Sequence, residues 1–213
     1  MVILLPPTLA AAVSIAGGYL LGSIPFGVIA SRLGGVGDVR SIGSGSIGAT
    51  NVLRTGRREL AAITLVGDAG KGAAAVLLAW KFLGPETVVL AGGAAFTGHL
   101  FSVWLKFHGG KGVATFFGVM LAIAWPAGLA AGAVWLAMAV AFRFSSLASL
   151  TAAALAPGLV FALHRAGDGR GERLWLAVFM GVLIFVRHRQ NINRLLNGAE
   201  PRLGAKTPEP TLP

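Results

Sequence analysis

Cysteine is absent from this sequence of 213 residues, and acidic residues are scarce. The absence of cysteine excludes disulfides, thiolate metal sites and a cysteine nucleophile. The four histidines show no i,i+4 pairing that would place two of them on one helix face, and Asp and Glu together number eight. We therefore expect neither a metal site nor a cofactor.

Charge of either sign is also rare. Charged residues make up 12% of the chain, which is about half the fraction found in ordinary soluble domains. Hydrophobic residues make up 55%, and the mean hydropathy is +0.75. A soluble protein of this composition would have too little polar surface to cover itself. The sequence therefore indicates an integral membrane protein.

The charge that is present is mainly basic, with 18 Lys and Arg and a net charge of +10. Such an excess suits nucleic acid, an anionic lipid surface or an anionic substrate. The basic residues lie in short loops between apolar stretches and form no basic face on a soluble helix, which argues against nucleic acid. Lipid and small anions remain as candidate partners.

Seven apolar stretches follow one another along the chain. They run over residues 9–31, 59–82, 86–106, 112–124, 126–142, 145–164 and 172–187. No Lys or Arg precedes Arg32, so the first stretch lacks the basic region of a signal peptide, and we interpret it as a retained span. Since about 20 helical residues cross a bilayer core, the region 112–142 is long for one span and short for two.

The basic loops predict the orientation of the chain, because cytoplasmic loops are rich in Lys and Arg. Residues 32–58 carry five basic residues, the segment from 187 onward carries five more, and Lys106 and Lys111 form a third basic loop. All three lie inside only if 112–142 crosses twice or re-enters. We expect an all-α polytopic membrane protein with about seven transmembrane helices, the N-terminus outside and the C-terminus cytoplasmic. Five long spans, with 112–142 as one tilted helix, are the alternative.

The domain organisation follows from the same pattern. Residues 1–200 are expected to form one transmembrane domain. Residues 201–213 contain several prolines and few apolar side chains, so we expect a disordered tail there.

A first polar cluster, Ser41–Arg54, lies between the first two spans. Its glycines allow the backbone to approach a ligand closely with its N–H groups turned inward. Serines, Thr50 and Asn51 add short donors, and Arg54 adds a cation that can bind phosphate in a bidentate manner. The glycines also satisfy G-x-G-x-x-G, but a dinucleotide fingerprint must follow a strand and open a βαβ helix. The cluster favours an oxyanion cradle, with a flexible Gly/Ser loop as the alternative.

A second cluster joins Gly98–Leu100 to Phe107–Thr115. Lys111 lies between glycines where a helix begins, and the N-terminus of a helix favours an anion. No Ser or Thr follows the lysine, so this is not a Walker loop. A topological anchor for Lys111 and a packing role for His99 are the alternatives.

Two further features carry charge. Asp68 and Lys71 lie inside an apolar span, three residues apart on one helix face. Charges at membrane depth are normally paired or line a polar cavity, so both a structural pair and a ligand role stay open. After the last span, His188 and Asn191 share a helix face within a basic segment. A tail that binds anionic lipid would explain the charge of this segment but not its His and Asn.

Together these motifs resemble a known family. The runs Gly22–Gly27, Gly43–Arg54, Gly98–Thr115 and Arg187–Leu196, in this order, are similar to the bacterial acyl-phosphate:glycerol-3-phosphate acyltransferases, the PlsY family. The resemblance covers nearly the whole chain.

The sequence departs from the family at two positions. Ser46 replaces the usual Asn and keeps a short polar group, so phosphate contacts could survive. Ser102 replaces the usual Pro, which removes a helix constraint and could loosen the approach to the Lys111 loop.

The resemblance implies a seven-span enzyme of the bacterial inner membrane with its active site on the cytoplasmic face. The enzyme would move a fatty acyl group from acyl phosphate to the sn-1 hydroxyl of glycerol 3-phosphate, forming 1-acylglycerol 3-phosphate and phosphate. Glycerol 3-phosphate, acyl phosphate and membrane lipid would be its partners, with no obligate protein partner. The rival function is a transporter or channel for a phosphate-bearing anion, although the chain has no convincing internal repeat.

The motifs and the resemblance together name the candidate site. As catalytic residues we expect Lys111, His188, Arg54 and Asn191. As substrate-binding residues we expect Ser44, Ser46, Asn51, Ser146, Lys71, Ser23, His99, Gly45, Gly110 and Arg194. The general base is either His188, whose unperturbed pKa is suitable, or a phosphate oxygen of the substrate.

Overall fold

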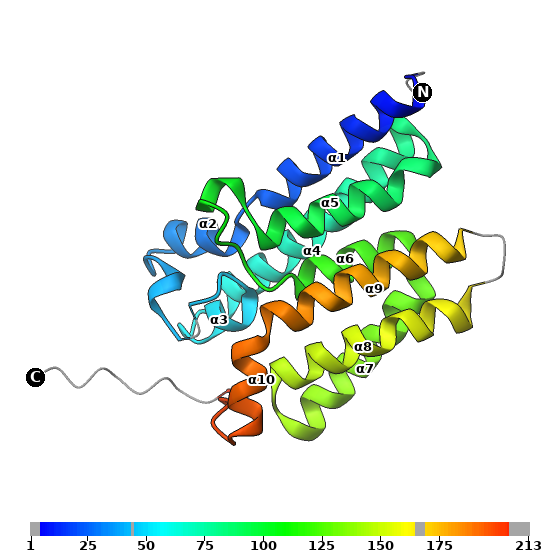
Figure 1. Ribbon diagram of the computed structural model, residues 1–213. Coiled ribbons are helices and arrows are strands. Elements are labelled where there is room, and N and C mark those ends of the chain that lie inside the picture. The colour runs from blue at the N-terminus through cyan, green and yellow to red at the C-terminus, as the bar shows by residue number, and fades with distance from the viewer. Residues whose placement is uncertain (1–4, 44, 165–168, 205–213) are drawn as a thin grey trace, which may run out of the picture.

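The structure is a computed structural model, and it describes residues 5–43, 45–164 and 169–204. Within these ranges the regular structure is entirely helical (Figure 1). The expectation of an all-α fold is therefore confirmed.

The first apolar stretch forms two helices, α1 (Pro7–Ser23) and α2 (Phe26–Leu33). The break falls at Pro25, which has no N–H to donate and disfavours helical geometry in the residue before it. α1 packs closely on α5 (Val88–Leu100), because a Cβ added at Gly22 would lie only 1.9 Å from the carbonyl oxygen of Ala95. Small residues commonly allow such close approach between membrane helices.

The loop after α2 carries a short 3₁₀ turn, η1 (Val39–Ser41), and the short helix α3 (Ala49–Leu53). The long helix α4 (Arg58–Leu83) follows and leads through η2 (Pro85–Thr87) into α5. A third 3₁₀ turn, η3 (Val103–Leu105), comes after α5.

The region 112–142 forms two helices, α6 (Val113–Ile123) and α7 (Trp125–Phe142), which are joined at Ala124. Residues 112–142 are therefore not a single tilted helix, while the count of seven crossings stays a prediction. Pro126 lies in the first turn of α7, where its missing N–H costs nothing. A Cβ added at Gly128 would lie 2.9 Å from the backbone nitrogen of Leu121, so α7 turns back directly against the end of α6.

The chain ends in α8 (Ser145–Leu163), α9 (Arg170–Arg187) and α10 (Arg189–Leu196). In the described residues, five segments are long and apolar enough to cross a membrane. These are Pro7–Leu33, Arg58–Leu83, Pro85–Leu105, Trp125–Phe142 and Ser145–Leu163. The protein is thus a multi-pass membrane protein, while α6, with 11 residues and about 16 Å of helix, is shorter than a full crossing.

The buried core is built from the central helices, with Phe96, Phe116, Met120 and Met180 fully enclosed. Many large apolar side chains point outward instead, such as Trp80. Contiguous apolar surface of this kind is typical of contact with lipid.

The predicted tail 201–213 is described only as far as residue 204. Its first residues contact the bundle, because the Leu203 amide donates to the Arg143 carbonyl at 2.6 Å. The rest of the tail lies outside the described residues, so its predicted disorder stays a prediction.

Candidate active site

The predicted polar clusters gather at one end of the bundle, where α2, α3 and α10 lie (Figure 1). The start of α8 joins them, since the hydroxyls of Thr50 and Ser145 are 3.2 Å apart. The loop after α2, the start of α8 and α10 are distant in sequence and thus lie at one end of the bundle.

Lys111 is central to this end of the molecule. It belongs to the stretch Gly109–Gly112, which we call the glycine loop and which leads into α6. Gly112 has a φ of 84°, a left-handed conformation that glycine adopts without strain. The Lys111 ammonium donates to the side-chain oxygen of Asn191 on α10 at 2.6 Å. The structure therefore brings together two of the residues predicted to be catalytic.

Glu200 completes this cluster, and the sequence analysis did not identify it. Its Oε1 accepts hydrogen bonds from the Ser146 hydroxyl and the Asn191 amide, both at 2.6 Å. Its Oε2 accepts from Arg194 Nε at 2.7 Å. The only signal in the sequence was a lone carboxylate after a basic segment, in a stretch taken to be the end of the domain. Ser146, Asn191 and Arg194 are thus held by one carboxylate.

Those hydrogen bonds determine the charge of Glu200. Burial raises the pKa of a carboxyl, but the bonds from Ser146, Asn191 and Arg194 outweigh it, so the pKa of Glu200 is lowered. The carboxylate is ionised at neutral pH and compensates part of the positive charge around it.

More positive than negative charge surrounds Lys111. Burial is the main cause that lowers the pKa of Lys111, to about 8. Glu200 raises this pKa, while Arg194, Arg54 and Arg187 lower it further. The influence of Arg54 places the first polar cluster within electrostatic range of the glycine loop. A site in which cations depress one another's pKa values is suited to an anion.

His188 lies at the junction of α9 and α10 and is buried. Its Nδ1 lies 2.8 Å from the Ile184 carbonyl, which can only accept, so Nδ1 carries the hydrogen and Nε2 keeps its lone pair. Burial and the neighbouring Lys111 are the largest causes that lower the pKa of His188 to about 4. The ring is therefore neutral at pH 7 and is a weak base.

Asn51 shapes the first cluster instead of pointing a free amide at a ligand. Its Nδ2 donates to the carbonyls of Val39 and Ile42, each at 2.9 Å. These bonds use both amide hydrogens. The expected role of Asn51 in binding substrate stays a prediction. A Cβ added at Gly43 would lie 2.8 Å from Arg54 Nη1, so this glycine makes room for the guanidinium.

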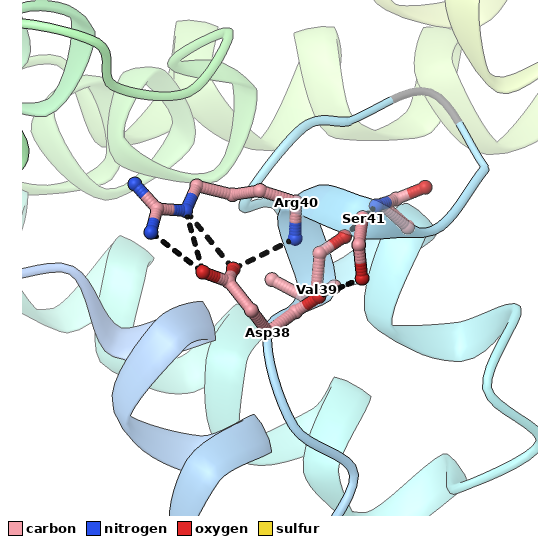
Figure 2. A network of polar contacts seen from close by, with 5 residues as sticks. Asp38, Val39, Arg40 and Ser41 are labelled. Carbon is pink, nitrogen blue, oxygen red and sulfur yellow. Dashed lines mark hydrogen bonds and ion pairs between the residues drawn. The ribbon is translucent and has the colours of Figure 1, made fainter.

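Asp38 supports the same loop, as Figure 2 shows. Its carboxylate accepts from the Arg40 backbone at 3.0 Å, which caps η1, and from Arg40 Nη2 at 2.6 Å. The Ser41 hydroxyl donates to the Asp38 carbonyl at 2.7 Å. The hydrogen bonds from Arg40 lower the pKa of Asp38 to about 2. Arg40 is thus paired, whereas no ion pair of the described residues includes Arg54.

Of the remaining residues of the predicted oxyanion cradle, the structure describes Gly45 and Ser46. Gly45 has a positive φ of 66°, and the Ser46 hydroxyl accepts from the Gly48 amide at 3.4 Å. Ser44 lies outside the described residues, so its predicted role stays a prediction.

Lys71, which we expected to bind substrate, forms a buried ion pair within the helix bundle. Its ammonium donates to Asp68 Oδ1 at 2.7 Å and to the Ile24 carbonyl at 2.6 Å. The side chains of Lys71 and Asp68 are only 1% and 0% exposed. The sequence left two roles open for Lys71, a structural ion pair and a contact with a ligand. The structure shows the ion pair, because the ammonium is hydrogen-bonded and buried.

Ser23 and His99 are also buried, and their expected contact with substrate stays a prediction. His99 Nδ1 lies 3.5 Å from Asp68 Oδ1. The Ser102 hydroxyl donates to the Ser23 carbonyl at 2.5 Å, across the break between α1 and α2. Ser102 therefore ties η3 to α1, and the expected loosening at this position stays a prediction.

The chain is similar to a family of known proteins. The family model described as "Glycerol-3-phosphate acyltransferase" matches residues 12–198. A glycerol-3-phosphate acyltransferase of Caulobacter vibrioides is 63% identical over 94% of this chain and 91% of its own length. One of Dinoroseobacter shibae is 58% identical over 94% of this chain and 96% of its own length.

Two solved structures are also similar. They are crystal structures of PlsY, an integral membrane glycerol 3-phosphate acyltransferase, in its glycerol 3-phosphate form and its lysophosphatidic acid form. Both are 39% identical to this chain and cover 91% of it. The TM-scores are 0.83 and 0.82, and this chain covers 96% and 95% of the respective structures.

Proposed function

This chain belongs to the glycerol-3-phosphate acyltransferase family and is a membrane acyltransferase, and we propose that acyl phosphate is its donor and the sn-1 hydroxyl its target. The products are then 1-acylglycerol 3-phosphate and inorganic phosphate. The observation that carries the proposal is the excess of positive charge around Lys111. Arg54, Arg187 and Arg194 all act on this ammonium, while Glu200 is the acid that opposes them. A reaction with two phosphate-bearing substrates requires such a surplus.

Lys111 binds one phosphate together with the start of α6. The first amides of a helix have no partner within it and favour an anion. Gly112 caps α6 without a side-chain hydrogen bond, so no side chain competes for these amides. Arg54 and the Gly45–Ser46 segment bind the second phosphate, with Asn51 and Asp38 supporting their loop.

The chemistry then consists of one acyl transfer. The hydroxyl oxygen of glycerol 3-phosphate attacks the acyl carbonyl carbon, and an ester C–O bond forms. The bond between that carbon and the phosphate oxygen breaks, and the phosphate leaves with the electron pair. The mixed anhydride is already activated, so positioning and charge stabilisation supply most of the rate.

The proton of the hydroxyl goes to a phosphate oxygen. A phosphate has a second pKa of about 6, whereas the pKa of His188 is about 4. The phosphate is therefore the stronger base at neutral pH. Nε2 of His188, with its lone pair, accepts a hydrogen bond that orients the attacking hydroxyl.

The acyl chain lies in an apolar groove of about 730 Å³ between α1, α5 and α9. Ile15, Gly93 and Phe179 contribute to its walls. Tyr19 lines it as well, and its hydroxyl donates to the Phe101 carbonyl at 2.7 Å. Because the Phe101 ring lies 5.7 Å from the Arg187 guanidinium beside the glycine loop, the groove leads toward the reacting groups.

The site faces the cytoplasm of a bacterial cell, at the inner membrane. The positive-inside rule supports this orientation, since the loops that build the site carry the basic residues. Although α6 is short, we count it with α9 as a membrane segment in addition to the five long ones. Seven such segments would place the N-terminus outside and the C-terminus inside. Residues 1–200 act as one domain without an obligate protein partner.

An acyl-transfer assay on purified protein in lipid tests the proposal. Palmitoyl phosphate and glycerol 3-phosphate should give lysophosphatidic acid, and palmitoyl-CoA should not replace the donor. Lys111→Ala should lower turnover about 100-fold or more, the typical loss when one charge-stabilising donor is removed. Lys106→Ala is the matched control, because this lysine is exposed and lies five positions earlier.

Two results would overturn the proposal. Equal product from palmitoyl-CoA would reject acyl phosphate as the donor. Binding of labelled glycerol 3-phosphate by folded protein, with transport across vesicles and no product, would favour the phosphate-bearing anion transporter instead.

A further inference from the structure

Arg187, the last residue of α9, lies against the backbone of the glycine loop. Its Nη2 donates to the Gly109 carbonyl at 2.7 Å, and its Nε donates to the Gly110 carbonyl at 3.1 Å. Its guanidinium also stacks near the Phe101 ring, with 5.7 Å between Cζ and the ring centroid. Two consecutive carbonyls are thus held by one rigid side chain, which is partly buried.

The opposite side of the same two peptides is held by the end of α5. The Gly110 amide donates to the His99 carbonyl, and the Gly109 amide donates to the Leu100 carbonyl, both at 3.1 Å. A Cβ added at Gly110 would lie 2.3 Å from His99 Nε2, so the loop lies directly on this ring. The N–H and C=O groups of both glycines are therefore all used.

The next residue along the chain is Lys111. Its ammonium bonds to Asn191, which follows Arg187 by four residues. The junction of α9 and α10 therefore holds the glycine loop twice, through the backbone by Arg187 and through the lysine side chain by Asn191. Any movement of the two glycine peptides would move Lys111 and the free amides at the start of α6.

We propose that Arg187 is a positioning residue for acyl transfer, which fixes the Gly109 and Gly110 peptides so that Lys111 faces the substrate phosphate. Arg187 acts through the loop and does not contact substrate. The inference rests on the proposed function above. The planar guanidinium presents several donors in a fixed fork, whereas a lysine is a flexible point charge, so the two are not equivalent here.

The test compares Arg187→Gln and Arg187→Lys with Arg189→Gln as the matched control. Arg189 is exposed and begins α10, two positions after Arg187. Arg187→Gln should lower kcat/KM about 100-fold, the loss that a misplacement of about 1 Å can cause. Arg187→Lys can bond one carbonyl and should lose about tenfold, and Arg189→Gln should stay within about twofold.

A spin label measures the position of the loop independently of activity. The chain has no cysteine, so His108→Cys provides a unique attachment site on an exposed residue next to Gly109. The label should become more mobile in Arg187→Gln, less so in Arg187→Lys, and not at all in Arg189→Gln.

The outcomes separate the possible roles. A loss of activity in Arg187→Gln without a change in label mobility would mean that Arg187 acts on the substrate directly or through its charge on Lys111. Either result would overturn the proposal. Activity within threefold of the unsubstituted protein would overturn it as well. If Arg187→Gln does not fold, Arg187→Lys decides: a normal rate and a normal label would reject the positioning role. If the unsubstituted protein itself forms no product, the proposed function fails, while the label still reports whether Arg187 holds the loop.

Discussion

Lys71 is buried and Lys111 is half-buried, and the surroundings of these two lysines differ in charge balance. Lys71 donates to a carboxylate and a backbone carbonyl, at 2.7 and 2.6 Å, and both members of its pair with Asp68 are almost fully enclosed. Lys111 donates to a neutral amide oxygen, and the nearby carboxylate of Glu200 is already bonded to Arg194. Balanced charge inside a membrane protein maintains the structure, whereas surplus charge is available to a ligand.

The largest effect that tests this comparison is on stability. Lys71→Met leaves the Asp68 carboxylate and the Ile24 carbonyl without their buried donor, so the free energy of unfolding should fall by about 3–5 kcal/mol. Lys111→Met removes one cation from a cluster of cations and should leave stability unchanged or raised. Thermal unfolding in the same detergent measures both.

The double variant Asp68→Asn with Lys71→Met serves as the control, because it removes the unpaired charge. It should recover part of the lost stability. Equal losses in Lys71→Met and Lys111→Met would contradict the distinction between the two lysines.

A smaller effect is expected from a substitution of Glu200, and this effect concerns activity instead of stability. Glu200→Gln keeps the shape of the side chain but replaces one acceptor oxygen with an NH₂ donor. If the NH₂ group faces Arg194, two donors oppose each other. If it faces Ser146 and Asn191, these two residues lose their shared acceptor. We expect kcat/KM to fall about 100-fold, which corresponds to roughly 2.7 kcal/mol. The matched control is Glu59→Gln, an exposed carboxylate that pairs with Arg57 and should change the rate less than about twofold. An unchanged rate in Glu200→Gln would show that the network does not position the site.

The smallest effect concerns pH, because Lys111 has a pKa of about 8. If its ammonium is required, the rate should fall about tenfold for each pH unit above 8. The free energy of unfolding should rise over the same pH range, because the folded state releases the Lys111 proton at a lower pH than the unfolded chain does. The contribution of Lys111 to the free energy of unfolding therefore rises with pH between about 8 and the ordinary lysine range.

Lys111→Arg keeps its charge at these pH values and should lose the alkaline decline of the rate. A decline that persists in Lys111→Arg would assign it to another group. No loss from protonation of His188 is expected until the pH approaches its pKa of about 4.

Several features of the fold could be predicted from the sequence because they depend on local composition. Most of the apolar stretches correspond to observed helices, although the first is divided into α1 and α2, and the break at residue 125 divides α6 from α7. The clusters around Arg54, Lys111 and Asn191 were also recognised, because Gly-rich loops with short donors and cations are rare between apolar spans. These patterns follow from hydropathy and backbone chemistry, which neighbouring residues determine.

Other features were decided by contacts between distant segments. Glu200 joins Ser146, 54 positions earlier, and Lys111 joins Asn191, 80 positions later. No periodicity encodes such pairings, so Glu200 was missed and Arg187 was not distinguished from its basic neighbours. The role of Asn51 was missed for a related reason, because its amide bonds to carbonyls that only the folded loop places nearby.

By itself the sequence determined that this protein lies in a membrane, roughly which segments are helical, and which loops carry the polar and basic residues. Those properties depend on the transfer of apolar side chains from water and on local backbone preferences. Only the tertiary structure decided which charges neutralise one another and which remain in surplus. Coulombic and hydrogen-bond energies depend on distances of a few ångströms, and helix packing sets those distances between residues far apart in the chain.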